Sequence, residues 1–449
     1  MTDWLGMTAA ALGRGIGEAE IDPVELTDAF LDAIAAHPLR DRVYARVTAE
    51  RARAEAAAAR DRARAGQRLG PLDGVPVSWK DLFDTAGVAT EAGSALLEGR
   101  VPARDCEVLR NARAAGLVCL GKTHMSELAF SGLGLNPMTA TPPCVNDAAA
   151  VPGGSSSGAA ASLAFGLAAG AIGSDTGGSV RIPAAWNDLV GLKTTAGRLS
   201  LDGVVPLAPR FDTVGPLGRS VEDAAAMLAA LDGGRAADLR GARLTGLRFA
   251  DLRTVVMDDI RAAPGAAHAA AIDRLRGAGA VVDALDAPEV AEAMPLSPVL
   301  FAGEAYGLWR DVIETAPERM FAPIRERFRG GAAFSAADYV AAWRTLERLR
   351  AGWRARVAGY DAVLMPSAPN LPPEHDRLLS DEDYYVTENL LTLRNTRVAN
   401  LMGLCAVTLP TGSPSCGLML CGAPFGEERL LRVAAAVEAA LVRGGAPEN

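Results

Sequence analysis

Residues 152–183 decide the fold, and they read PGGSSSGAAASLAFGLAAGAIGSDTGGSVRIP. Two clusters of glycine and serine flank an apolar run of 15 small residues, 159–173. Glycine lets the backbone adopt positive φ and approach other groups closely, and serine supplies hydroxyl groups. Composition alone leaves both a turn-rich linker and a functional site open. The apolar run requires burial, however, so we interpret the stretch as a folded segment that brings its two polar clusters together.

The motif Gly-Gly-Ser-Ser-Ser-Gly, followed 24 positions after Ser155 by Ser179 in Asp-Thr-Gly-Gly-Ser, closely resembles the amidase signature family. Upstream, the β-prone sequence GVPVSWKD at residues 74–81 resembles the lysine block of that family and contains Lys80. The resemblance is dense over residues 72–231, thins over 240–356 and returns at 361–366 and 400–410. Members of this family hydrolyse or transfer carboxamides with a Ser-Ser-Lys triad.

The resemblance implies a role for each residue of the triad. Ser179 would be the nucleophile, Ser155 the bridging serine behind a cis peptide bond, and Lys80 the base. Lysine can act as a base only when it is neutral, so its pKa must be lowered by burial or by positive neighbours. The apolar approach to Lys80 permits such burial. The backbone N–H groups expected to face the oxyanion are those of Thr176, Gly177, Gly178 and Ser179.

Substrate-binding residues are harder to name, because the middle third of the chain diverges from the family. In the family this region helps to line the substrate tunnel, which makes Tyr306 and Trp309 candidates, although aromatic residues at helical spacing usually belong to the core. Ser131 and Gly132 are further candidates, upstream of the serine motif. Three departures from the family pattern bear on specificity, namely Ser157, the triplet 186–188 and His124, which we interpret as a structural hydrogen-bonding residue.

Two other motifs suggest different chemistry. Residues 116–123 fit the phosphate-binding pattern Gly-x-x-x-x-Gly-Lys-Thr, but Leu-Val-Cys-Leu between the glycines predicts a strand rather than a loop around phosphates. Residues 154–158 fit the nucleophile elbow Gly-x-Ser-x-Gly with Ser156 at its centre. An elbow needs a preceding apolar strand and a histidine base downstream, and only His268 and His375 follow, without a supporting pattern.

Composition excludes several classes of function. A formal net charge of −9 argues against nucleic acid as a partner. Six cysteines without paired Cys-x-x-Cys spacing and four histidines without an i, i+4 pair predict neither a disulfide framework nor a metal site. The sequence contains no run of 18 apolar residues and no basic start of a secretory signal. We therefore expect a cytoplasmic, cofactor-independent protein without membrane contact.

Strands alternate with helices along the chain and predict an α/β fold. The resemblance implies the amidase signature fold, a mixed, many-stranded central sheet covered by helices on both faces. We expect a single domain over residues 1–449. Its parts would be a helical N-terminal layer (1–70), the signature core (72–231), a variable and mainly helical substrate-side region (240–356) and a C-terminal return to the core (361–445).

Our main hypothesis is a free-standing amidase that hydrolyses a small or medium carboxamide through an acyl-enzyme, with the chain alone or as a homodimer. A first alternative is the transamidating subunit that acts on aminoacyl-tRNA with partner chains, although residues 131–137 do not match the corresponding block of that subunit. From other classes, a nucleotide-binding protein or a catalytically inactive scaffold remains open. The sequence does not identify the substrate.

Overall fold

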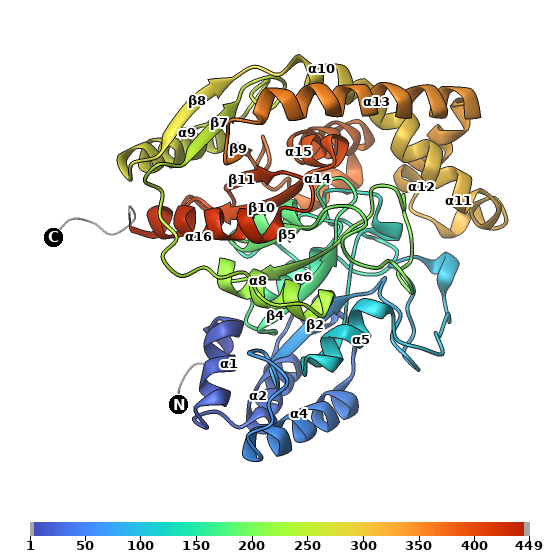
Figure 1. Cartoon of the computed structure of the whole chain (residues 1–449). Helices are drawn as coiled ribbons and strands as arrows, with labels where there is room; N and C mark the ends of the chain where they lie inside the picture. The colour runs from blue at the N-terminus through green and yellow to red at the C-terminus, as the bar shows by residue number, and fades with distance from the viewer. Residues whose placement is uncertain (1–3, 444–449) are drawn as a thin grey trace.

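A single large mixed sheet runs through the molecule (Figure 1) in the computed structural model, which describes residues 4–443. Its strands follow the order β1-β3-β2-β4-β6-β5-β10-β11-β9-β7-β8. The strands are β1 (Tyr44–Val47), β2 (Pro76–Lys80), β3 (Val118–Thr123), β4 (Gly170–Ser174), β5 (Val190–Lys193), β6 (Val214–Gly218), β7 (Arg248–Leu252), β8 (Val281–Leu285), β9 (Ala362–Pro366), β10 (Cys405–Pro410) and β11 (Gly417–Gly422). β2 pairs in parallel with both β3 and β4, and β7 in parallel with both β8 and β9. The other neighbours are antiparallel.

Helices surround this sheet, and several begin at the caps that the sequence predicts. The side chain of Asp22 accepts a hydrogen bond from the N–H of Val24, and that of Ser220 accepts one from Asp223. The helices are α1 (Ala9–Gly17), α2 (Pro23–Ala36), α3 (Arg40–Val43), α4 (Ala49–Arg64), α5 (Glu107–Ala114), α6 (Ser157–Ala164), α7 (Arg181–Trp186), α8 (Val221–Asp232), α9 (Ala262–Gly277), α10 (Pro288–Ala293), α11 (Gly303–Ile313), α12 (Ala322–Arg329), α13 (Ala336–Val357), α14 (His375–Ser380), α15 (Glu382–Met402) and α16 (Glu427–Arg443). No helix within residues 4–443 combines the length and the apolar character needed to cross a bilayer.

Both faces of the sheet are covered, as glycines in its strands show. A Cβ atom on Gly417 of β11 would meet Ala185 of α7, whereas one on Gly422 of the same strand would meet Leu430 of α16. These two positions are an odd number of residues apart and therefore point to opposite faces. Helices α7 and α16 thus lie on opposite sides, and the predicted architecture of a mixed sheet between helical layers is confirmed.

The segment that decides the fold forms a helix followed by a strand. α6 begins at Ser157, within the first glycine and serine cluster, and β4 ends at Ser174, directly before residues 175–179. β4 lies beside β2, so the segment returns the second cluster to the sheet next to Lys80 at the end of β2. This hairpin-like path brings Ser155 and Ser174 to the same lysine.

The region 240–356 contains two strands in addition to its helices. Figure 1 shows α10, α11, α12 and α13 grouped together beyond the sheet, but the same region also supplies β7 and β8. These two strands form one edge of the sheet. Side chains of β8 are mostly exposed or half-buried, so the strand lacks the continuous apolar run of a central strand.

Candidate active site

Lys80 is the last residue of β2 and is fully buried. Its Nζ lies 2.7 Å from Oγ of Ser155 and 2.8 Å from Oγ of Ser174, the last residue of β4. Because β2 and β4 are parallel neighbours, their C-terminal ends meet at one edge of the sheet, where ligand sites of α/β proteins are commonly built. The position of Nζ of Lys80 is therefore set by two hydroxyl groups rather than by a carboxylate.

Burial, rather than the neighbouring charges, favours the neutral form of Lys80. Burial lowers the pKa of Lys80 to about 7, although the carboxylates of Asp175 and Asp212 act in the opposite direction. No carboxylate within residues 4–443 forms an ion pair with Nζ. A large fraction of Lys80 is thus unprotonated at neutral pH and able to accept a proton.

Ser155 is held in a tight turn between three segments. The peptide bond between Gly154 and Ser155 is cis, and the carbonyl oxygen of Ser155 accepts a hydrogen bond from the N–H of Ser126 at 3.1 Å. The next residue, Ser156, donates its N–H to the carbonyl oxygen of Ser179 at 3.2 Å. The two serine motifs, 24 residues apart in the sequence, are therefore in direct contact.

Ser179 belongs to a loop of residues 175–180, the Ser179 loop, which is fixed from within by a buried ion pair. Asp175 accepts hydrogen bonds from Nε and Nη2 of Arg181 at 3.0 and 2.8 Å, and both residues are fully buried. Burial alone would raise the pKa of Asp175, but Arg181 and further donors hold it well below its ordinary value. A bidentate pair of this kind fixes both charge and orientation.

The backbone N–H groups of the Ser179 loop fall into two classes. The N–H of Gly178 donates to Oδ1 of Asp175 at 2.8 Å and is therefore engaged within the protein. The N–H groups of Thr176, Gly177 and Ser179 have no acceptor within residues 4–443. The hydroxyl of Thr176 donates to Asp212, which fixes the start of the loop.

A small cavity of about 30 Å³ opens beside Ser179. Some lining residues come from the Ser179 loop, others from the segment 129–131, and the remainder lie far along the chain. The lining residues are Ala129, Phe130, Ser131, Thr176, Gly177, Ser179, Leu207, Phe301, Arg327, Leu393 and Arg397. This volume is well below the range for small-molecule sites.

The candidate substrate-binding residues are placed differently by the structure. Ser131 lines the cavity, and its Oγ lies 3.2 Å from Oδ1 of Asn389, whereas the N–H of Gly132 donates to that same oxygen. Tyr306 and Trp309 lie outside the lining. The hydroxyl of Tyr306 contacts Glu314, and the indole N–H of Trp309 donates to the carbonyl oxygen of Pro206.

The variable region does reach the cavity, but through Phe301 and Arg327. Sequence reasoning missed these two residues, and also Ser174 and Arg397. Ser174 stands next to the quoted motif Asp-Thr-Gly-Gly-Ser and could have been suspected from that position alone. The two arginines carry no local pattern that separates them from the many other helical arginines.

The key side chains of the phosphate-binding pattern and of the elbow pattern make structural contacts within the protein. Lys122 of the phosphate-binding pattern lies within β3, is fully buried and pairs with Asp81 at 3.2 Å. Its backbone is therefore part of the sheet and does not form a loop around phosphates. Oγ of Ser156, the centre of the elbow pattern, lies 3.3 Å from the carbonyl oxygen of Ser174. The two downstream histidines are paired elsewhere, His268 with Asp251 and His375 with Asp376.

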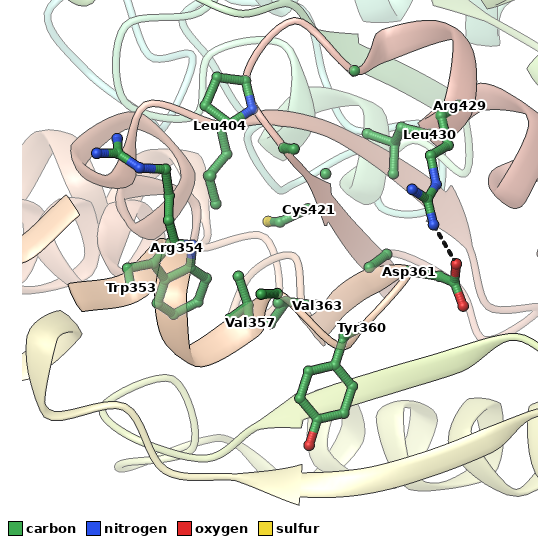
Figure 2. A pocket seen from close by; sticks show the side chains of 16 residues that line it. Trp353, Arg354, Val357, Tyr360, Asp361, Val363, Leu404, Cys421, Arg429 and Leu430 are labelled. Atoms are coloured by element: carbon green, nitrogen blue, oxygen red, sulfur yellow. Dashed lines mark hydrogen bonds and ion pairs between the residues drawn. The ribbon is translucent and has the colours of Figure 1, made fainter. Parts of the chain in front are cut away.

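A larger cavity of about 290 Å³ lies elsewhere, between the end of α13 and the start of α16 (Figure 2). It shares no lining residue with the cavity beside Ser179. Figure 2 shows Trp353 and Tyr360 at its wall and the ion pair of Arg429 with Asp361, 2.6 Å apart. Burial raises the pKa of Cys421, the thiol in this wall, to about 12, so the group is not a nucleophile at neutral pH.

Comparison with known proteins decides the family. The family model described as Amidase matches residues 25–431, almost the whole chain. The chain belongs to the amidase family. Its membership confirms the resemblance seen in the sequence and identifies this amidase-family protein as an enzyme that acts on the carbon–nitrogen bonds of amides.

Individual relatives of this amidase-family chain carry several activities in their names. It is 38% identical to 2-amino-5-chloromuconic acid deaminase of Comamonas testosteroni, over 98% of this chain and 100% of that protein. It is 35% identical to the A subunit of the glutamyl-tRNA(Gln) amidotransferase of Anaeromyxobacter dehalogenans strain 2CP-C, over 97% and 96% of the two chains. The crystal structure of the peptide amidase from Stenotrophomonas maltophilia superposes with a TM-score of 0.80 at 28% identity, over 97% of both chains.

Proposed function

We propose that this enzyme hydrolyses a small carboxamide through an acyl-enzyme, with Ser179 as nucleophile, Ser155 as proton relay and Lys80 as base. The observation that carries the proposal is the buried Lys80, which lacks an ion-pair partner within residues 4–443 and lies 2.7 Å from Ser155. A serine hydroxyl needs such a base to become a nucleophile at neutral pH. The hydrogen bond between Ser156 and the carbonyl of Ser179 keeps the nucleophile motif against the relay.

Acylation follows from these positions. As Oγ of Ser179 forms a bond to the amide carbon, its proton passes to Oγ of Ser155, whose own proton passes to the neutral Nζ of Lys80. The tetrahedral intermediate then breaks its carbon–nitrogen bond, and the proton returns through Ser155 to the leaving nitrogen, which departs as ammonia or an amine. Water attacks the resulting ester by the same proton path and releases the carboxylate and Ser179.

The carbonyl oxygen of the amide becomes negative in the transition state, and it needs hydrogen-bond donors that are already in position. Of the four N–H groups that the resemblance implies, that of Gly178 is engaged by Asp175, so the proposal rests on Thr176, Gly177 and Ser179. All three residues line the cavity in which the amide carbonyl would lie. Removal of one such donor typically costs about 3 kcal/mol of transition-state stabilisation.

The test combines covalent labelling with turnover. A fluorophosphonate probe is expected to add once to the wild-type chain, at Ser179, with the adduct located by peptide mass spectrometry. Ser179→Ala is expected to abolish the adduct, and Lys80→Met and Ser155→Ala to slow its formation. On a panel of neutral primary amides, each of the three variants is expected to lower kcat by at least about 1,000-fold, because the three residues act as one unit.

Ser156→Ala serves as the matched control for this test, since Ser156 neighbours the relay but contacts only the Ser174 backbone through its hydroxyl. We expect the Ser156 variant to keep the adduct on Ser179. An adduct on Ser156 in the wild type, or wild-type turnover by any of the three triad variants, would refute the assigned roles.

The similarity to the A subunit of glutamyl-tRNA(Gln) amidotransferase favours a second candidate function, in which the chain releases ammonia for transfer to an aminoacyl-tRNA with partner chains. This candidate predicts that the purified chain alone is almost inactive on free amides and gains activity when partner chains and charged tRNA are added. Turnover of free amides by the isolated chain, unchanged by those additions, distinguishes hydrolysis from transfer.

A further inference from the structure

Two arginine side chains line the cavity beside Ser179, and they come from different parts of the chain. Arg327 lies on α12 of the variable region, and Arg397 lies on α15. Nη1 of Arg327 donates to the carbonyl oxygen of Phe130 at 2.9 Å, and its guanidinium carbon lies 4.3 Å from the centre of the Phe130 ring. The rest of the lining is apolar apart from hydroxyl groups and the backbone of the Ser179 loop.

Arg397 is held next to the Ser179 loop by its neighbours on α15. The hydroxyl of Thr396 donates to the carbonyl oxygen of Gly177 at 2.7 Å. A Cβ atom on Gly177 would lie 3.9 Å from Cγ of Arg397, so the stem of this arginine passes directly over the loop. Its guanidinium has no hydrogen-bond or ion-pair partner in the part of the chain that the structure describes, residues 4–443.

Neither guanidinium has a carboxylate within 4 Å among the described residues. The nearby Glu127 is occupied by other donors, the hydroxyl of Ser94 and the N–H of Phe321. Burial lowers the pKa of Arg397 to about 9, with Arg327 as the second cause, and burial lowers that of Arg327 to about 10. Both groups remain cationic at pH 7 and share one small cavity without a counter-ion from residues 4–443.

Two buried cations elsewhere in this protein are neutralised by carboxylates. Arg181 pairs with Asp175, and Lys122 pairs with Asp81. Arg327 and Arg397 are half-buried, and a charge partly withdrawn from water without a partner is costly, so proteins generally pair it or use it to bind an opposite charge. The arginine pair therefore provides two positive charges for an anion that is not part of the chain.

On the basis of the proposed function, we infer that the substrate is an amide that carries a carboxylate, and that Arg327 and Arg397 bind this carboxylate while Ser179 attacks the amide carbon. Guanidinium groups bind carboxylates through two parallel hydrogen bonds, which fixes orientation as well as charge. Because the arginines and Ser179 line the same small cavity, the carboxylate and the amide must belong to one short molecule. The substrate class is thus the monoamides of short dicarboxylic acids and their close analogues.

The experiment compares amides that differ in charge. Ammonia release is measured for malonamate, succinamate and glutaramate, and for butyramide as a neutral partner of succinamate. We expect kcat/KM for the best acid to exceed that for butyramide by about 10- to 100-fold, the range that charged hydrogen bonds provide. Arg397→Met is expected to reduce that preference by a similar factor, and Arg397→Lys, which keeps the charge, to restore part of it.

Arg394→Met is the matched control, because Arg394 lies one turn earlier on α15 and donates to the carbonyl oxygen of Val256, away from the cavity. We expect the Arg394→Met variant to prefer the best acid over butyramide to the same extent as the wild type does. Binding is followed separately through the melting temperature in succinate against chloride at equal ionic strength. Succinate should stabilise the wild type and Arg394→Met, and should not stabilise Arg397→Met.

The outcomes separate the two proposals. Hydrolysis of butyramide as fast as the acids, with Ser179 labelled by the fluorophosphonate and no stabilisation by succinate, overturns the inference and leaves the amidase mechanism standing. Stabilisation by succinate that depends on Arg397, without labelling of Ser179 or turnover of any amide, supports the anion site and refutes the proposed mechanism.

Discussion

Arg181 and Arg397 lie on the two sides of the Ser179 loop and show how differently this protein uses the same residue type. On the inner side, Arg181 is fully buried and binds Asp175, Asn400 and the carbonyl oxygen of Thr396. On the cavity side, Arg397 has no partner within residues 4–443. Both arginines touch the same helix and the same loop, so packing alone does not explain the difference. A charge that is paired with a carboxylate fixes the loop, and one that is not paired is available to a ligand.

The largest loss of stability should come from removing the buried ion pair on the inner side of the Ser179 loop. Arg181→Met leaves the carboxylate of Asp175 buried without its ion-pair partner, and we expect the free energy of unfolding to fall by about 3 to 5 kcal/mol. Arg397→Met removes a charge that has no partner among the described residues, so its free energy of unfolding should change by less than about 1 kcal/mol. Urea unfolding of both variants measures the two values. Equal losses would mean that the two arginines are not used differently.

The neighbouring glycines of the loop give a second contrast. Gly178 has a φ of +143°, and a Cβ atom there would lie 2.2 Å from Oγ1 of Thr396, whereas a Cβ atom on Gly177 meets nothing closer than 3.8 Å. Gly178→Ala should therefore lower the free energy of unfolding by about 2 to 3 kcal/mol, because strain and overpacking combine. Gly177→Ala should keep the stability of the wild type to within about 1 kcal/mol in the same unfolding assay. A larger loss for Gly177→Ala than for Gly178→Ala would contradict this geometry.

Lys80 is a further basic residue of the site, and its effect on stability should depend on pH. Its pKa is about 7 in the folded protein against 10.5 for the ordinary side chain, so between these values the unfolded chain binds one more proton. Stability must then rise with pH across this window, by about 1.4 kcal/mol per pH unit. We expect the free energy of unfolding of the wild type, minus that of Lys80→Met, to increase by this amount between pH 7.5 and 8.5.

The subtraction removes the contributions of all groups that titrate alike in both proteins. A difference that stays constant with pH would show that Lys80 is protonated in the folded state and would argue against its role as a base.

The part of the site that could be predicted from the sequence is the part that lies in contiguous motifs. Lys80, Ser155 and Ser179 each stand inside a short block with a recognisable pattern, and the structure brings the first two to 2.7 Å. The sheet was predictable for a related reason, because its central strands are buried on both sides and read as short apolar runs. The edge strand β8 has no such run, and the strong helical pattern around it dominated the prediction.

The residues around the cavity could not be predicted from the sequence, because the role of each depends on which elements pack against it. Arg327 and Arg397 are 70 residues apart on two helices, and Arg325 or Arg394 would have looked equally suitable in the sequence. Ser174 acquires its contact with Lys80 only because β4 pairs with β2. Trp309 had the aromatic character expected of a pocket wall, yet its indole N–H is used to hold the backbone at Pro206.

The hydrogen bond from Thr396 to the carbonyl oxygen of Gly177 lets α15 fix the distance between the Ser179 loop and Arg397. Because Thr396 is tied to the Ser179 loop and Arg397 follows it on the same helix, a tilt of α15 carries the loop and the positive charge together. The span between Ser179, the proposed nucleophile, and this charge is thereby kept constant. Arg327, on α12, has no hydrogen bond to residues 175–180 within the described part of the chain. An enzyme for longer or shorter acyl chains is therefore more readily obtained by moving the charge along α12 than by changing α15.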